Sequence, residues 1–160
     1  MKKLAAILLA LCLCVLSVSG VAEAATETES VQGLVLTQLA DDLPLGVFMP
    51  ETWTRSVDEN GYELFTNGDG SMELRVAVIE TTTDDLKARA DATEGYSYLE
   101  ETINEVPWLL VRSSDWTGIL AITMVGDNLA LDLEFTCDGA INWDQTADIC
   151  TILNTLYALD

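Results

Sequence analysis

Apolar and polar residues alternate along much of the second half of the chain. The alternation is clearest in residues 129–137, where one face would carry Leu129, Leu131, Leu133, Phe135 and Cys137. A period of two is typical of a β-strand with one buried face. Turn signals divide the preceding residues, and the same pattern predicts three more strands there, at Tyr98–Ile103, Trp108–Ser113 and Ile119–Val125.

Two turn signals lie close together earlier in the chain, at Asp58–Gly61 and Asn67–Gly70. Asn and Gly tolerate positive φ, so Asn-Gly between apolar runs is a strong hairpin signal. The sequence therefore predicts a three-stranded meander, with strands at Trp53–Val57, Tyr62–Thr66 and Ser71–Glu80. Before the meander, the apolar stretch Leu43–Trp53 predicts a short strand that Pro50 stops.

Two segments follow a helical pattern instead. Thr82, with Asp85 three residues later, can cap a helix at about residues 84–94, whose narrow apolar stripe consists of Leu86 and Ala90. The second helix, predicted at residues 143–158, has a fuller inner stripe that consists of Ile149, Ile152, Leu153 and Leu156. We expect this closing helix to be the main cover of the sheet.

The first residues have the three parts of a secretory signal. Lys2 and Lys3 precede an apolar run, and Ala22-Glu23-Ala24 is a small-x-small cleavage step. The run is about 15 residues, too short for a stable membrane span. We expect residues 1–24 to be cleaved, residues 25–42 to be a flexible acidic lead-in, and residues 43–160 to form one secreted domain without a membrane helix.

The chain is strongly acidic. It has 7 basic and 27 acidic residues, and cleavage would remove Lys2, Lys3 and Glu23, which leaves 5 basic and 26 acidic residues. Such a surface repels nucleic-acid phosphates and anionic lipid, and it favours solubility, cationic partners or divalent cations. We therefore exclude nucleic acid as a partner. A solvated acidic exterior with no specific partner is the simplest explanation of the charge.

Histidine is absent from the sequence. Its absence removes the commonest general base, the Ser-His and Cys-His nucleophile systems and the usual zinc sites. A small carboxylate-based or metal-assisted hydrolase remains as an alternative, with its acids among Asp115, Asp132 and Glu134. The sequence identifies no catalytic, cofactor-binding or metal-binding residue, so we expect a protein that is not an enzyme.

Calcium binding is a second alternative. The turns Asp58–Asn60 and Asn67–Asp69 offer oxygen ligands at alternate positions, but neither completes an EF-hand loop with its closing glutamate. Hairpin turn chemistry explains both segments without a metal. A calcium-responsive surface protein with weak binding therefore stays open.

Two cysteines and three tryptophans are further candidate functional residues. Cys137 ends the apolar face of a strand and Cys150 borders the stripe of the closing helix, so their side chains can meet. A disulfide there would close a loop of about 14 residues and contribute roughly 3 kcal/mol; two buried free thiols are the alternative. Trp108, Trp116 and Trp143 lie at predicted turn edges, where they would contact a partner or plug the ends of a small core.

Four stretches, LGVFMPETW, INEVPW, NLALDLEFTC and ICTILNTLYAL, match a known family in pattern and order. Across about residues 43–160 the chain resembles the family of the photosystem extrinsic protein PsbP and the nuclear-transport factor Mog. The resemblance implies an α+β fold, with a single antiparallel sheet of about six to seven strands sandwiched between helices in an α/β/α arrangement. Glu105 stands where the family's strand turn frequently has glycine.

Members of that family act as binding or assembly proteins for unrelated partners, so the resemblance transfers no specific role. The leading hypothesis is a small secreted, non-catalytic binding or assembly module without a cofactor. Its partner would be an unknown protein or a cationic molecule.

Overall fold

The fold is built mainly from β-strands. The computed structural model describes residues 30–159 except residues 32 and 42, so the predicted signal sequence lies outside the described residues. The described residues fall into two units: Thr52–Asn142 forms one, and residues 30–51 together with 143–159 form the other. In this part of the chain, no helix has the length and apolar character needed to cross a membrane.

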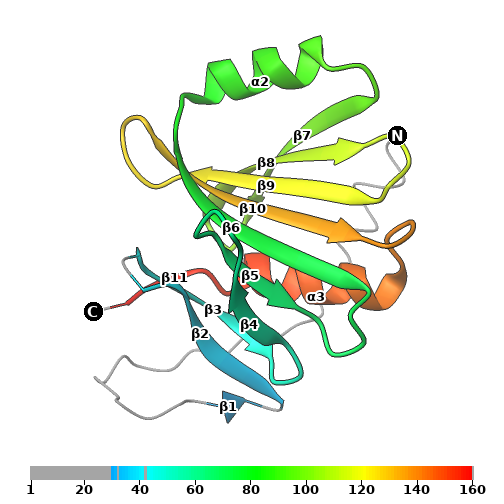
Figure 1. The fold of residues 1–160 in the computed structure, drawn as a ribbon. Coiled ribbons are helices and arrows are strands. Elements are labelled where there is room, and N and C mark those ends of the chain that lie inside the picture. Colours follow the sequence, from blue (N-terminus) through cyan, green and yellow to red (C-terminus); the bar gives the residue numbers. More distant parts are fainter. Residues whose placement is uncertain (1–29, 32, 42, 160) are drawn as a thin grey trace. The chain divides into compact units, whose positions relative to one another are not determined.

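A seven-stranded antiparallel sheet forms the larger unit (Figure 1). Its strands are β4 (Thr54–Val57), β5 (Glu63–Thr66), β6 (Met72–Glu80), β7 (Tyr96–Ile103), β8 (Val106–Ser113), β9 (Gly118–Met124) and β10 (Leu129–Cys137). Their order across the sheet is β4-β5-β6-β10-β9-β8-β7. The structure therefore confirms the predicted meander, which becomes β4 to β6, and the four predicted strands that become β7 to β10.

The two faces of this sheet differ in polarity, as the alternating pattern predicts. One face carries large buried side chains; Phe135 of β10, for example, lies opposite Leu74 of β6, and both are fully buried. The other face carries charged residues at the same strands, where Glu134 of β10 lies opposite Arg75 of β6. Asp132 lies on this second face, two residues before Glu134.

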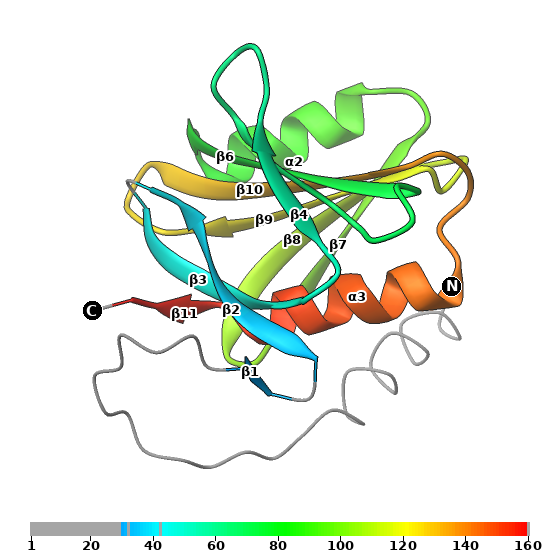
Figure 2. The same cartoon turned by 60° about the horizontal axis from the view of Figure 1, so that its bottom comes forward.

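Helix α2 (Thr83–Ala92) lies over the second face (Figure 2). Thr82 caps it as predicted, because the Thr82 Oγ1 accepts a hydrogen bond from the backbone N–H of Asp85 at 3.2 Å. The buried residues of the helix are Leu86 and Ala90. They pack in one cluster with Leu109, Val111, Ile122 and Ala130. The predicted narrow stripe is thus confirmed, and a small apolar contact holds α2 on the sheet.

A two-residue turn joins β7 to β8. Asn104 (φ 48°) and Glu105 (φ 67°) both have left-handed backbone conformations, the arrangement of a type I′ hairpin loop. Glycine is favoured at the second position of this loop because it has no Cβ to clash. Glu105 therefore holds a strained conformation in this hairpin.

The smaller unit combines segments from both ends of the chain. Its sheet has the order β1-β2-β3-β11, and its elements are β1 (Ser30–Val31), β2 (Leu34–Ala40), β3 (Leu43–Pro50), helix α3 (Trp143–Asn154) and β11 (Tyr157–Ala158). Helix α3 contacts β3. The Thr155 hydroxyl accepts a hydrogen bond from the backbone N–H of Phe48 at 2.9 Å and donates one to the carbonyl oxygen of Thr151 at 2.8 Å. Thr155 thereby ties the end of α3 to β3.

The predicted α/β/α fold is wrong. The described residues form two sheets, of four and seven strands, and two helices, which is a β-rich arrangement rather than one sheet between helix layers. The physical reason lies in Leu34–Ala40, which the sequence analysis places in the flexible lead-in 25–42. This apolar segment pairs along β3 and so builds a second sheet.

The closing helix also differs from its prediction. It ends at Asn154 rather than at residue 158, because Tyr157 and Ala158 pair with Gly46 and Leu45 of β3. Its contact with β3 places it in the four-stranded unit. Residues 43–160, predicted as one domain, are accordingly divided between the two units.

Candidate functional site

Strand β7 is an outer strand of the seven-stranded sheet. It pairs with β8 along its whole length, and no strand among the described residues pairs with its other side. Tyr96, Tyr98 and Leu99 of this strand are 47%, 36% and 41% exposed. An edge strand points alternate N–H and C=O groups outward. β7 therefore has an outer side that pairs with no described strand, together with exposed apolar side chains; the N–H of Tyr96 donates to the carbonyl oxygen of Thr93 at 3.3 Å.

The opposite edge of the same sheet is better protected. β4 has four residues, and Arg55 of this strand forms an ion pair with Glu63 of β5, with 2.7 Å between Arg55 Nη2 and Glu63 Oε1. Short length and charged side chains are two common ways to protect an edge from pairing with another chain. β7 has eight residues, and the first four, Tyr-Ser-Tyr-Leu, carry no charge. Of the two edges, β7 is the one suited to accept another strand.

Acidic residues lie in β7 and just before it. Glu100 and Glu101 belong to β7, and Glu94 lies just before it. Lys87 of α2 lies with its Nζ 2.6 Å from Glu100 Oε1, and this hydrogen bond raises the pKa of Lys87. Residues 52–142 contain 18 acidic and 5 basic residues. The potential at this edge therefore favours a cationic partner.

A cavity of about 170 Å³ lies between α2 and strands β7, β8 and β9. Four of its lining residues, Leu86, Trp108, Leu109 and Ile122, are buried. Three others, Glu100 and Thr102 of β7 and Pro107 of β8, are exposed. The cavity thus extends from a polar mouth at the β7 edge to an apolar floor beneath α2.

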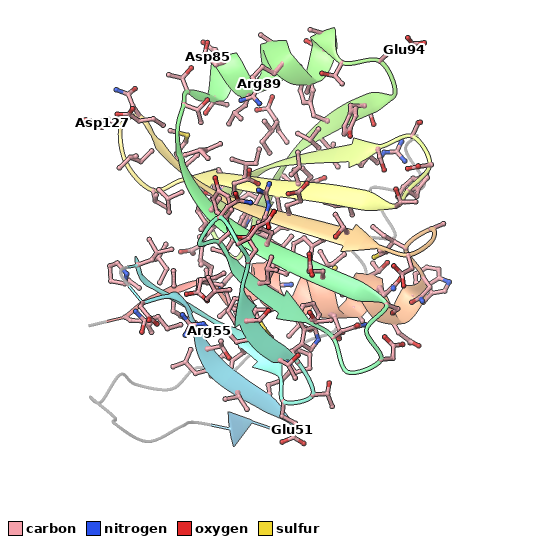
Figure 3. The ribbon with its side chains drawn as sticks, in the orientation of Figure 1. Glu51, Arg55, Asp85, Arg89, Glu94 and Asp127 are labelled. Atoms are coloured by element: carbon pink, nitrogen blue, oxygen red, sulfur yellow. The ribbon has the colours of Figure 1, made fainter. Side chains whose placement is uncertain are left out.

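A charged cluster occupies the same face of the sheet over β6 and β10. The Nε of Arg75 donates a hydrogen bond to Glu134 Oε2 at 2.7 Å, and its guanidinium lies 4.9 Å from the centre of the Tyr62 ring. Asp132 is partly buried, and its Oδ1 has no hydrogen-bond partner among the described residues. Arg89 extends from α2 above this face (Figure 3).

Burial is the main cause that raises the pKa of Asp132, to about 6, and the negative charge of Glu134 acts in the same direction. The positive charges of Arg75 and Arg89 act in the opposite direction. Asp132 therefore changes its protonation close to neutral pH. The ion pair with Arg75 occupies Glu134, the acid two positions along the same strand.

The structure brings together two of the three acids that sequence analysis proposed for a hydrolase. Asp132 and Glu134 share a face of β10, whereas Asp115 lies in the turn between β8 and β9. Hydrogen bonds from the side chain of Ser113 and from Thr117 lower the pKa of Asp115. Asp115 thus stabilises its own turn and does not join the other two acids.

The three predicted partner-binding tryptophans have different environments. Trp108 is 2% exposed, because its position in β8 turns it into the core. Trp116 is partly buried beneath the guanidinium of Arg112, whose Cζ lies 3.9 Å from the ring centre. Trp143 is 64% exposed at the start of α3. A partner role for Trp116 and Trp143 stays a prediction.

No disulfide joins Cys137 to Cys150 in the part of the chain that the structure describes. Cys150 is buried and Cys137 partly buried, and burial, followed by the charge of Asp138, raises the pKa of Cys137. The two cysteines belong to different units of the chain. A disulfide between them stays a prediction.

The oxygen-rich turns proposed for calcium use their carboxylates locally. Asp58 Oδ1 accepts hydrogen bonds from the backbone N–H groups of Asn60 and Tyr62, at 2.8 and 2.9 Å, and Asp69 Oδ1 accepts one from Ser71 at 3.0 Å. Hydrogen bonds of this kind lower the pKa of both carboxyls. Within the described residues, no group of three or more acidic, histidine or cysteine side chains is arranged to hold a metal ion.

Sequence analysis predicted the β7 strand but missed its role as an exposed edge. Local periodicity does not reveal which strand lies at the end of a sheet. The structure shows the exposure directly: the first five residues of Tyr96–Ile103 are all exposed.

Comparisons with known proteins give no family. No protein-family model matches the chain, and no curated protein matches it. Among solved structures, one from Bacteroides thetaiotaomicron is 16% identical, with a TM-score of 0.45 over 73% of this chain and 46% of that chain. The chain thus spans less than half of that structure's length. A likeness of this size carries no information about function, and the resemblance to the PsbP and Mog family stays a prediction.

Proposed function

We propose that the chain is an exported, non-catalytic binding module that captures an extended, cationic peptide segment as an additional strand beside β7. The observation that carries this proposal is the β7 edge itself, which is eight residues long, exposed and uncharged over its first half. In such strand addition, main-chain hydrogen bonds supply affinity and side chains at alternate positions supply specificity.

The charge of the chain supports a cationic occupant. Residues 52–142 have 18 acidic and 5 basic residues, and ion pairs with glutamates occupy three of those basic residues, Arg55, Arg75 and Lys87. A second copy of the chain would bring an equal excess of negative charge to the same edge. Like-charge repulsion therefore disfavours pairing of two β7 edges and favours a basic peptide.

A direct test uses a synthetic peptide in which threonine occupies every second position. The positions between the threonines are lysine, leucine and lysine, in that order. Isothermal titration calorimetry would measure its binding to the protein. We expect binding that weakens with added salt, and loss of binding when the peptide amides are N-methylated, because strand addition needs those donors. A peptide with glutamate in place of lysine should not bind.

Two matched variants locate the binding edge. Leu99→Lys in β7 adds a charge and removes an apolar contact, whereas Val57→Lys makes a comparable change at β4, where Val57 is 59% exposed. We expect Leu99→Lys to weaken peptide binding about tenfold, which corresponds to roughly 1.4 kcal/mol, and Val57→Lys to leave it unchanged. Equal effects of the two variants, or peptide-independent dimerisation through β7 in light scattering, would contradict the proposal.

A small carboxylate-based hydrolase is a second candidate, favoured by one observation. The pKa of Asp132 is raised to about 6 beside Glu134, as a general acid requires. Hydrolysis of chromogenic glycosides or esters that disappears in Asp132→Asn would support this candidate. Absence of turnover across the substrate panel in the wild-type protein would remove it.

A further inference from the structure

The cavity beneath α2 lies beside the edge that we propose as the peptide site. Glu100, Glu101 and Thr102 of β7 form part of its lining, so the edge strand and the cavity share residues. A strand added to β7 would place every second side chain on the α2 face of the sheet. One of those side chains would then meet the mouth of the cavity.

The floor of the cavity is suited to an apolar side chain. Leu86, Leu109 and Ile122 line it and are 8%, 5% and 4% exposed, and Met124 also contributes. An apolar cavity of comparable size, roughly 150 Å³, accommodates benzene in another protein. A volume of about 170 Å³ therefore has room for the side chain of leucine, methionine or phenylalanine.

The mouth of the cavity is suited to a positive charge. Lys87 already pairs there with Glu100 on the α2 face, and Glu101 lies at the next position of β7. A cationic side chain of the incoming strand, two positions from its apolar residue, would share the α2 face with Glu100. It would compete with Lys87 for the Glu100 carboxylate.

From this arrangement we infer that the cavity is a specificity subsite, which takes one large apolar side chain of the bound strand while a basic residue two positions away meets Glu100. The inference rests on the proposed function. It identifies the partner as a segment with alternating basic and apolar residues on one face. It also assigns Lys87 the role of a competitor that a bound basic residue displaces.

The test compares the leucine-centred peptide with the same peptide carrying alanine in place of leucine. We expect the alanine peptide to bind about tenfold more weakly, because the cavity would lose its apolar occupant. Thr102→Phe changes an exposed residue at the mouth and should close the cavity. The affinity of the leucine peptide should then fall to that of the alanine peptide. The variant should lower the affinity of the alanine peptide much less than it lowers the affinity of the leucine peptide.

Lys87→Ala supplies an independent readout. It should strengthen binding of the lysine-containing peptide about threefold, because Glu100 becomes available, and should not strengthen binding of a peptide with norleucine at the lysine positions. If the leucine and alanine peptides bind β7 equally well in the wild-type protein, the subsite is refuted while the proposed function stands. If neither peptide binds, the proposed function fails.

Discussion

Replacing Asp132 by asparagine should remove a specific pH dependence from the stability of the fold. The pKa of this carboxyl in the folded protein is about 6, against an ordinary value of 3.8. The folded state therefore binds the proton more tightly than the unfolded state. The resulting stabilisation is fully present below pH 3.8 and is lost as the pH rises through about 6.

The magnitude follows from the difference between the two pKa values. A shift from 3.8 to about 6 corresponds to about 3 kcal/mol over the full range, which is an upper value because Asp132 retains some contact with water. Between pH 5 and pH 7.5 the expected change is about 1.4 kcal/mol. The sequence pI is about 4.1, so the chain keeps its negative charge across this window.

The assay is urea unfolding of the wild-type protein and of Asp132→Asn at both pH values, with tryptophan fluorescence as the signal. The difference in unfolding free energy between the two proteins should shift by about 1.4 kcal/mol in favour of the variant as the pH rises from 5 to 7.5. Titration of other acids cancels in this comparison. Glu134→Gln, which breaks the ion pair with Arg75, is the control, and it should cost about 1 kcal/mol or less. A wild-type-to-variant difference that does not depend on pH would refute the assigned environment of Asp132.

Three further changes test other parts of the structure. Glu105→Gly should raise the free energy of unfolding by about 1 kcal/mol in urea titrations, because glycine adopts positive φ without strain, whereas Glu105→Gln, which removes only the charge, should not. Thr155→Val should lower the free energy of unfolding by about 1 to 2 kcal/mol, because a backbone N–H of β3 loses its acceptor. The control Thr151→Val should lower it less, and equal losses would argue against the hydrogen bond between the end of α3 and β3. If the predicted disulfide forms on export, Cys137 and Cys150 of the unfolded protein should resist alkylation until a reductant is added, as intact-mass measurements would show. Alkylation of both thiols in the unfolded protein without a reductant would remove the prediction.

Local sequence patterns were sufficient for most individual elements of the larger unit. The alternation of apolar and polar residues predicted β10, and the turn signals at Asp58–Gly61 and Asn67–Gly70 predicted the hairpins. Thr82 with Asp85 predicted the start of α2. Each of these features depends on residues that are neighbours in the chain. Physical rules for turns, caps and periodicity therefore apply to them directly.

Features that depend on pairing between distant segments could not be predicted in the same way. The assignment of Leu34–Ala40 to a strand depends on β3 as its partner, and the change from helix to strand after Asn154 depends on the same strand. The candidate site has this character too. Tyr98 and Leu99 matter because β7 ends the sheet, and strand order is a property of the whole unit.

Hydrogen exchange of the backbone amides, measured with and without the leucine-centred peptide, tests the central claim most directly. If the peptide adds as a strand to the exposed side of β7, amides of β7 that exchange rapidly in the free protein should become protected. Amides of β4, at the other edge, should keep their exchange rates. Protection confined to β4 or to turns, or unchanged exchange in β7 at saturating peptide, would contradict the account.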